Sequence, residues 1–116
     1  MKQLFIFTTF IIINFSTCIF AQTQAEMSQT AINDYKKVDS ELNKVYKEAF
    51  KNITTNEKKL LIIAQKNWIL FRDSKCKFEA EQFDGGSIQP LIKYTCLKET
   101  TEARIEDLKL IVNREY

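Results

Sequence analysis

The sequence predicts an all-α protein: an elongated up-down-up bundle of three helices in which a disulfide staples the hairpin of the second and third helices. After residue 25, apolar residues recur at steps of three and four, which is the spacing of one helical face. No segment alternates with the two-residue period of a strand, and only two glycines and one proline interrupt the 116 residues. Helices of roughly 25 residues, at 1.5 Å per residue, would each be about 37 Å long.

Residues 1–21 have the features of a signal peptide, which leaves residues 22–116 as a single helical domain. Lys2 supplies a positive start, an apolar run follows it, and Ala21 is a small residue suited to cleavage. We therefore expect a periplasmic or secreted protein whose mature chain does not span a membrane.

Two alternatives to cleavage remain. The apolar run is short for a membrane span and contains several Thr, Asn and Ser residues, which disfavours an uncleaved anchor. If the chain were a lipoprotein, Cys18 would be the residue that carries the lipid, but the residues around it fit such a site poorly. Cleavage after Ala21 is therefore the preferred interpretation.

The first helix is expected from about residue 25 to residue 51, with a charged face turned outward. Its apolar positions follow the steps of three and four, as expected for a helix that buries one side. These positions are Met27, Ala31, Tyr35, Val38, Leu42, Val45, Tyr46, Ala49 and Phe50.

The second helix is expected to begin at a capping box, in which Thr54 is followed three residues later by Glu57. It continues to about residue 83. The segment 84–87 (Asp-Gly-Gly-Ser) ends it, because glycine suits a helix C-terminus and Ser87 is a suitable cap for the next helix. The third helix then runs from about residue 88 to residue 113, with Pro90 tolerated in its first turn.

Cys76 and Cys96 are the two cysteines left after cleavage, and a cysteine pair in an exported chain favours a disulfide. If Gly86 is the tip of the hairpin, these two residues face each other. A disulfide here would close a loop of about 20 residues and stabilise the fold by about 3 kcal/mol.

Steps of four residues from Cys76 and Cys96, away from the tip, predict further facing pairs. These pairs are Arg72 with Thr100, Trp68 with Arg104, Ala64 with Leu108, and Leu60 with Val112.

Residues of these stripes, together with two polar residues of the first helix, form one cluster, which we call the polar seam. A cation–π contact between Arg104 and Trp68 is expected, and Arg72 needs an acceptor if it is buried, for which Asp39 on the first helix is the candidate. We interpret the seam as structural, with a ligand-binding cluster as the alternative. Its members are Trp68, Arg72, Thr100, Arg104, Asp39 and Asn43.

Composition argues against several classes of function. Cleavage removes one of the 17 basic residues and none of the 15 acidic ones, so a net charge of about +1 remains, which does not favour nucleic acid as a partner. The chain has no histidine, so it lacks the usual general base and the commonest metal ligand. Glu79 and Glu81 point in different directions on a helix and do not form a glycosidase pair. We therefore expect no enzyme activity, no metal and no cofactor.

The hairpin tip is the candidate surface for a protein partner. It is acidic, contains two adjacent glycines and an aromatic residue, and stands on the disulfide-braced helices, whereas a plain connecting loop is the alternative. The residues that we expect to contact a partner are Phe83, Asp84, Gly85, Gly86 and Ser87.

The chain resembles the LprI-type lysozyme-inhibitor family over residues 24–110. The resemblance rests on Trp68, Arg72 and Cys76 at steps of four, the Asp-Gly-Gly-Ser tip, and the downstream series Cys96, Thr100, Arg104 and Leu108, together with the first-helix segment 39–46. It implies a small, helical, exported bacterial envelope protein, and for some members inhibition of lysozyme. The chain departs from the family at Thr30, where members commonly carry another cysteine.

Two functions follow as expectations. The first is a binding protein that inhibits a lysozyme sterically, by inserting the tip into the substrate cleft. The second is an envelope scaffold or adaptor that binds another exported protein and has no effect on lysozyme. Exposed apolar side chains at the tip would favour the inhibitor, and exposed apolar side chains along a helix face would favour the adaptor.

Overall fold

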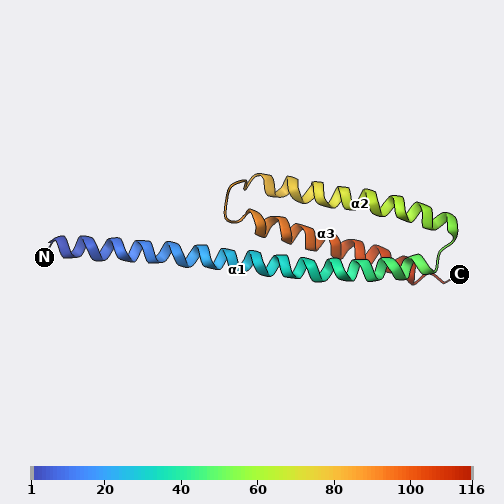
Figure 1. Cartoon of the computed structure of the whole chain (residues 1–116), viewed down its shortest axis with the longest axis horizontal. Helices are drawn as coiled ribbons and strands as arrows, with labels where there is room; N and C mark the ends of the chain where they lie inside the picture. Colours follow the sequence, from blue (N-terminus) through green and yellow to red (C-terminus); the bar gives the residue numbers. More distant parts are fainter. Residues whose placement is uncertain (1, 116) are drawn as a thin grey trace.

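The protein consists of three helices, of which the first and third run parallel and the second runs antiparallel to both, so the expected up-down-up arrangement is confirmed in a computed structural model (Figure 1). The structure describes the backbone of residues 2–115 and the side chains of residues 23–115. Helix α1 spans Lys2–Lys51, α2 spans Thr55–Glu81 and α3 spans Gln89–Val112. The signal-peptide prediction concerns side chains outside the described ones. The helix expected to begin near residue 25 is part of the longer α1.

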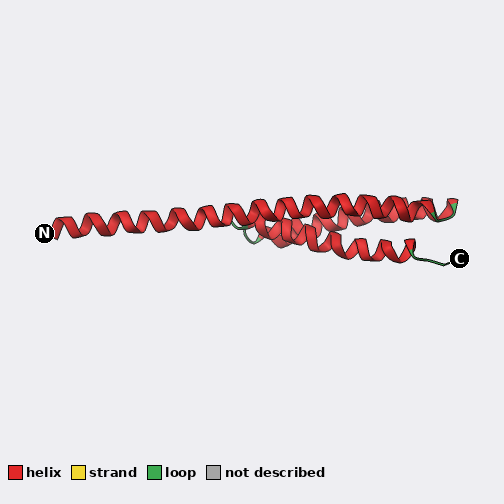
Figure 2. Cartoon of the chain, turned by 90° about the horizontal axis from the view of Figure 1, so that it is seen from below, coloured by secondary structure: helices red, strands yellow, loops and turns green. Residues whose placement is uncertain are grey.

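Helix α3 lies between the other two helices and packs against both of them (Figure 1). The view from below shows all three running alongside one another over the second half of α1 (Figure 2). Helix α3 packs much more extensively against α1 than against α2, and the backbones of α1 and α2 come close to each other at very few points. The attachment of α2 to the bundle therefore depends on a small number of side chains.

The main core fills the end of the bundle near the α1–α2 turn. Its buried members are Leu42 and Ala49 of α1, Leu61 of α2, and Ile105 and Leu108 of α3. Partly buried apolar residues surround it, but α2 supplies only Trp68 among them. A second, smaller cluster lies near the hairpin tip, where Cys76, Cys96 and Leu97 pack against Tyr35 and Tyr94.

The rotation of α2 differs from the expected one at the end far from the disulfide. Leu60 is 67% exposed, so the expected pairs of Leu60 with Val112 and of Ala64 with Leu108 are wrong. The residues that turn inward are Leu61 and Gln65. The reason is geometric: four residues advance a helix by about 400°, so a stripe of four-residue steps rotates about 40° at each step.

The predicted capping box at the start of α2 is confirmed. The amide of Glu57 donates to the Thr54 hydroxyl at 3.2 Å, and the amide of Thr54 donates to the Glu57 carboxylate at 2.8 Å. At the start of α3 the expectation is wrong, because Ile88 is the N-cap residue and makes no side-chain cap bond. The Ser87 hydroxyl instead donates to the side-chain oxygen of Gln24 on α1, so the tip is tied to the first helix.

Within the described part of the chain, no helix is both long enough and apolar enough to cross a membrane.

A matched pair of leucine substitutions tests the rotation of α2. Leu61→Ala should lower the free energy of unfolding by about 2–4 kcal/mol, because it removes a buried side chain from the main core. Leu60→Ala should change it by less than about 0.5 kcal/mol, because that side chain is exposed. Urea denaturation of dilute protein measures both values. Equal losses for the two variants would contradict the observed rotation.

Candidate functional site

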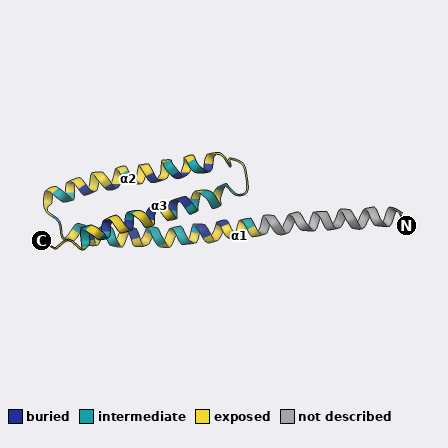
Figure 3. Ribbon diagram, turned by 180° about the vertical axis from the view of Figure 1, so that it is seen from behind, coloured by how far each residue is buried: buried dark blue, intermediate teal, exposed yellow. Residues whose placement is uncertain are grey.

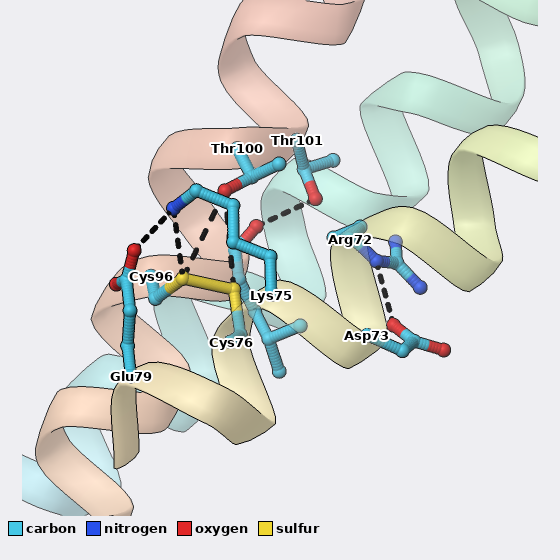
Figure 4. The surroundings of a disulfide bond; sticks show 9 residues. Arg72, Asp73, Lys75, Cys76, Glu79, Cys96, Thr100 and Thr101 are labelled. Atoms are coloured by element: carbon cyan, nitrogen blue, oxygen red, sulfur yellow. Dashed lines mark hydrogen bonds and ion pairs between the residues drawn. A yellow bond between two sulfur atoms is a disulfide. The ribbon is translucent and has the colours of Figure 1, made fainter.

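The predicted disulfide is confirmed: Cys76 of α2 is bonded to Cys96 of α3, with a Cα–Cα distance of 5.5 Å (Figure 4). Both residues are buried, so the bond lies inside the bundle and is not a surface link. The Lys75 ammonium covers it, 3.5 Å from the Cys96 sulfur and 2.6 Å from the Glu79 carboxylate. The bond therefore holds α2 against α3 about two turns from the tip.

Arg72 is the main polar contact between α1 and α2. Its side chain is only 8% exposed, and Nη1 donates to Asp39 of α1 at 3.2 Å while Nε donates to Asp73 at 2.9 Å. The guanidinium also lies over the rings of Tyr35 and Trp68, at 5.6 and 5.1 Å from their centroids. Two carboxylates and two aromatic faces thus compensate the cost of burying this charge.

Arg72 and Tyr35 keep their usual protonation states at neutral pH. Burial alone would lower the pKa of Arg72, but the hydrogen bond to Asp73 and the surrounding negative charge raise it above its usual value. Burial also raises the pKa of the Tyr35 phenol, although the charge of Arg72 opposes that effect. The pair therefore remains a cation beside a neutral phenol, which suits a structural role and not proton transfer.

A second guanidinium extends the contact to α3. Arg104 lies 5.8 Å from the centroid of the Trp68 ring, and its Nε donates to the side-chain oxygen of Gln65 at 3.0 Å. Gln65 is a member of the cluster that was not expected from the sequence. The helical period could have indicated it, because Gln65 precedes Arg72 by seven residues, or about two turns, and therefore lies on the same side of α2.

The other two residues assigned to the polar seam lie at its margins. The Thr100 hydroxyl is 3.9 Å from each sulfur of the disulfide, and thus beside the bond and not at the Arg72 guanidinium. Asn43 is exposed and lines a groove between α1 and α2, together with Asp39 and Arg72. The seam therefore consists of a connected centre, from Asp39 through Arg72 and Trp68 to Arg104, with two peripheral members.

The hairpin tip is a compact turn with its own backbone hydrogen bonds. The amide of Gly86 donates to the carbonyl of Phe83 at 2.9 Å, and the Gln89 side chain donates to Asp84 at 3.4 Å. Gly85 has a φ of 73°, a left-handed conformation that glycine adopts without strain. Residues 84–87 are exposed, whereas Phe83 is half-buried. The tip therefore presents a carboxylate, a hydroxyl and bare backbone more than an aromatic ring.

Exposed apolar side chains are found mainly along α2 and not at the tip. Figure 3 shows α2 largely in the colour of exposed residues. The most exposed of these side chains on α2 are Leu60, Ile63, Leu70, Phe71 and Phe78. Phe78, at 81% exposure, is the one that comes nearest to the tip in the sequence.

The surface of residues 23–115 carries open grooves, and no group of three acidic or cysteine side chains there is arranged to hold a metal ion. One groove, between the middle of α1 and the start of α3, is lined by Thr30, Thr95 and Leu91. Thr30, which replaces a cysteine that is common in the resembled family, is exposed there and bonds only its own helix, at the carbonyl of Glu26.

Comparison with known proteins gives one family and one relative. The family described as "Lysozyme inhibitor LprI" matches residues 18–108, which include the disulfide, the polar seam and the tip. An uncharacterized protein of Rhizobium meliloti (strain 1021) is 31% identical over 105 residues, covering 79% of this chain and 76% of its own. No solved structure matches the chain.

Substitution of Arg72 tests whether the seam joins α1 to α2. Arg72→Ala should lower the free energy of unfolding by about 1–3 kcal/mol, since it removes a buried side chain with charge-assisted hydrogen bonds, while Asp39 and Asp73 are exposed enough to stay hydrated. Asp107→Ala, at an exposed position of α3, serves as the control and should change stability by less than about 0.5 kcal/mol. Chemical denaturation measures both. An Arg72→Ala protein as stable as the parent would show that the seam does not contribute to the fold.

Proposed function

Since the chain belongs to the LprI lysozyme-inhibitor family, we propose that it binds a lysozyme and inhibits it, with the α2–α3 tip inserted into the substrate cleft. The observation that carries the proposal is the position of the tip. It is an exposed turn at the end of two helices that a buried disulfide joins, and it is tied to α1 through Ser87 and Gln24. A loop held in this way loses little conformational entropy on binding.

The charge of the tip suits the cleft of a glycosidase. Glu81 and Asp84 are exposed, and no basic residue occurs between Lys77 and Lys93. Glycosidases of the lysozyme type keep their general acid protonated by raising its pKa, so that acid can donate a hydrogen bond to an inserted carboxylate. Asp84, beside the two glycines, is the carboxylate best placed to reach a recessed group, because the neighbouring backbone carries no side chains.

A second candidate function is an adaptor that binds another exported protein and does not affect lysozyme. The observation that favours it is the row of exposed apolar side chains on α2, since contact areas of this kind are typical of helix-mediated binding. The two functions use different surfaces, so one set of variants separates them.

Inhibition is tested by mixing the exported, oxidised protein with lysozymes of several types and following the clearing of a peptidoglycan suspension. The parent protein should protect the suspension in a dose-dependent manner. Asp84→Asn should weaken inhibition about 10- to 100-fold, the range expected when a charge-assisted hydrogen bond worth 1.5–3 kcal/mol is lost. Asp107→Asn, which neutralises an exposed carboxylate on α3 far from the tip, should inhibit like the parent.

Two outcomes would contradict the proposal at different levels. Full inhibition by both Asp84→Asn and Glu81→Gln would exclude the acidic tip as the inserted element while leaving inhibition itself in place. No protection by folded, oxidised protein at a large molar excess over each lysozyme would exclude the function and favour the adaptor.

We also propose that the chain is exported and cleaved after Ala21. Intact-mass measurement of protein recovered from the periplasm or medium should give a mass that begins at Gln22 and contains one disulfide. A mass that includes Cys18 with an attached lipid, or the whole of residues 1–21, would contradict this site of processing.

A further inference from the structure

Helix α2 carries apolar residues on two opposite sides, which a helix at the surface of a monomer does not need. One side contributes Leu61, Trp68 and Cys76 to the clusters of the bundle. The other side faces away from α1 and α3, because α2 is the outermost helix in Figure 1. This outer side is unoccupied by any described part of the chain, since its large apolar residues are 56–81% exposed.

The outer side has the spacing of a coiled-coil seam. Six exposed positions follow one another at gaps of four, three, four, three and four residues, which is the heptad pattern that two packed helices share. No charged residue occurs among them, and the first charged residues on the same line are Glu57 and Glu81 at the two ends. The six positions, which we call the outer seam, are Leu60, Ala64, Asn67, Phe71, Ser74 and Phe78. Ile63 and Leu70, both exposed, flank it on one side.

We propose that the outer seam is a homodimer interface in which the α2 helices of two copies pack antiparallel. The gap pattern is the same when it is read from either end, so a second copy running in the opposite direction meets the seam in register, with the two-fold axis at the level of residue 69. Phe78 then faces Leu60 of the second copy, Ser74 faces Ala64, and Phe71 faces Asn67. Each interface of this kind is isologous and closes as a dimer.

The flanking residues favour the antiparallel direction. In antiparallel helices the same flank of each copy meets, so Leu70 contacts Leu70 of the second copy across the two-fold axis. Ile63 contacts the aliphatic stem of Lys77 of the second copy, and the ammonium of that lysine remains in water. In a parallel pair, Leu70 of one copy would lie away from Leu70 of the other and would instead lie beside Lys75 of the second copy.

The exposed area matches what a dimer needs. With about 200 Å² for a large side chain, the exposed fractions of Leu60, Ile63, Leu70, Phe71 and Phe78 amount to roughly 650 Å², slightly above the largest patch on a typical monomer. Two copies would together bury at most about 1,300 Å² of apolar surface, which is near the lower limit for specific protein interfaces. An interface of this small size is typical of weak association, so a dissociation constant in the micromolar range is the expectation to be tested.

The dimer is independent of the proposed inhibition, because the tip is not part of the interface. Antiparallel pairing directs the two tips toward opposite ends of the dimer, so each tip remains free to bind a lysozyme.

Analytical ultracentrifugation of the exported, oxidised protein from about 1 to 500 μM tests the proposal, since this range brackets a micromolar dissociation constant. The parent should change from one to two copies across it. Phe71→Glu and Leu70→Glu should each weaken association at least tenfold without loss of helical circular dichroism. Leu110→Glu, which alters an equally exposed leucine on α3, should associate like the parent.

Cross-linking tests the direction of the helices. Oxidation of Leu70→Cys should link two copies, because this position meets its own counterpart only in the antiparallel pair, whereas Asn67→Cys should link poorly. The reverse result would exclude the antiparallel arrangement.

Two results of the first experiment would overturn the dimer itself. One is a monomer at every concentration. The other is a monomer that floats with anionic phospholipid vesicles and loses this binding with Phe71→Glu, which would assign the outer seam to a lipid surface.

Discussion

The rotation of α2 about its own axis is the constraint on which the other features of this protein depend. Because α2 shares little backbone contact with α1 and packs less closely on α3 than α1 does, a few side chains determine which of its faces turns inward. The Cys76–Cys96 disulfide fixes that rotation near the tip. Arg72 fixes it in the middle, through Asp39 on α1 and through the Trp68 ring that it shares with Arg104 of α3. Leu61 completes the attachment at the far end.

Two surfaces follow from this one constraint. With Cys76 and Arg72 turned inward, the connection between α2 and α3 becomes a short exposed turn at the end of a braced hairpin, and Asp84 is presented to solvent. The same rotation turns Phe71 and Phe78 outward, where no described part of the chain covers them. The acidic tip and the apolar outer seam are therefore different in chemistry and separate in position, and each can bind a partner without the other.

Much of the fold could be predicted from the sequence because its signals are local. Helical spacing, the Thr54–Glu57 capping box and the glycines of the tip each act within a few residues, and the symmetric placement of Cys76 and Cys96 about the tip indicated their bond.

The pairing of Leu60 and Ala64 with α3 was wrong because a four-residue stripe rotates by about 160° between Cys76 and Leu60. Gln65 was missed, and Ser87 was misassigned as a cap, because the contacts of both residues lie on other helices. The exposure of the α2 apolar residues depends on how all three helices pack, which spacing alone does not determine.

Hydrogen–deuterium exchange of the oxidised and the reduced protein tests the attachment of α2 most directly. If α2 is held to the bundle by the disulfide and the Arg72 contacts, while α1 and α3 form the main core, reduction should accelerate exchange in α2 and the tip far more than in residues 31–49 of α1 or in α3. Equal acceleration in all three helices, or exchange that begins in α1, would show that α2 is an integral part of the core and would contradict this account.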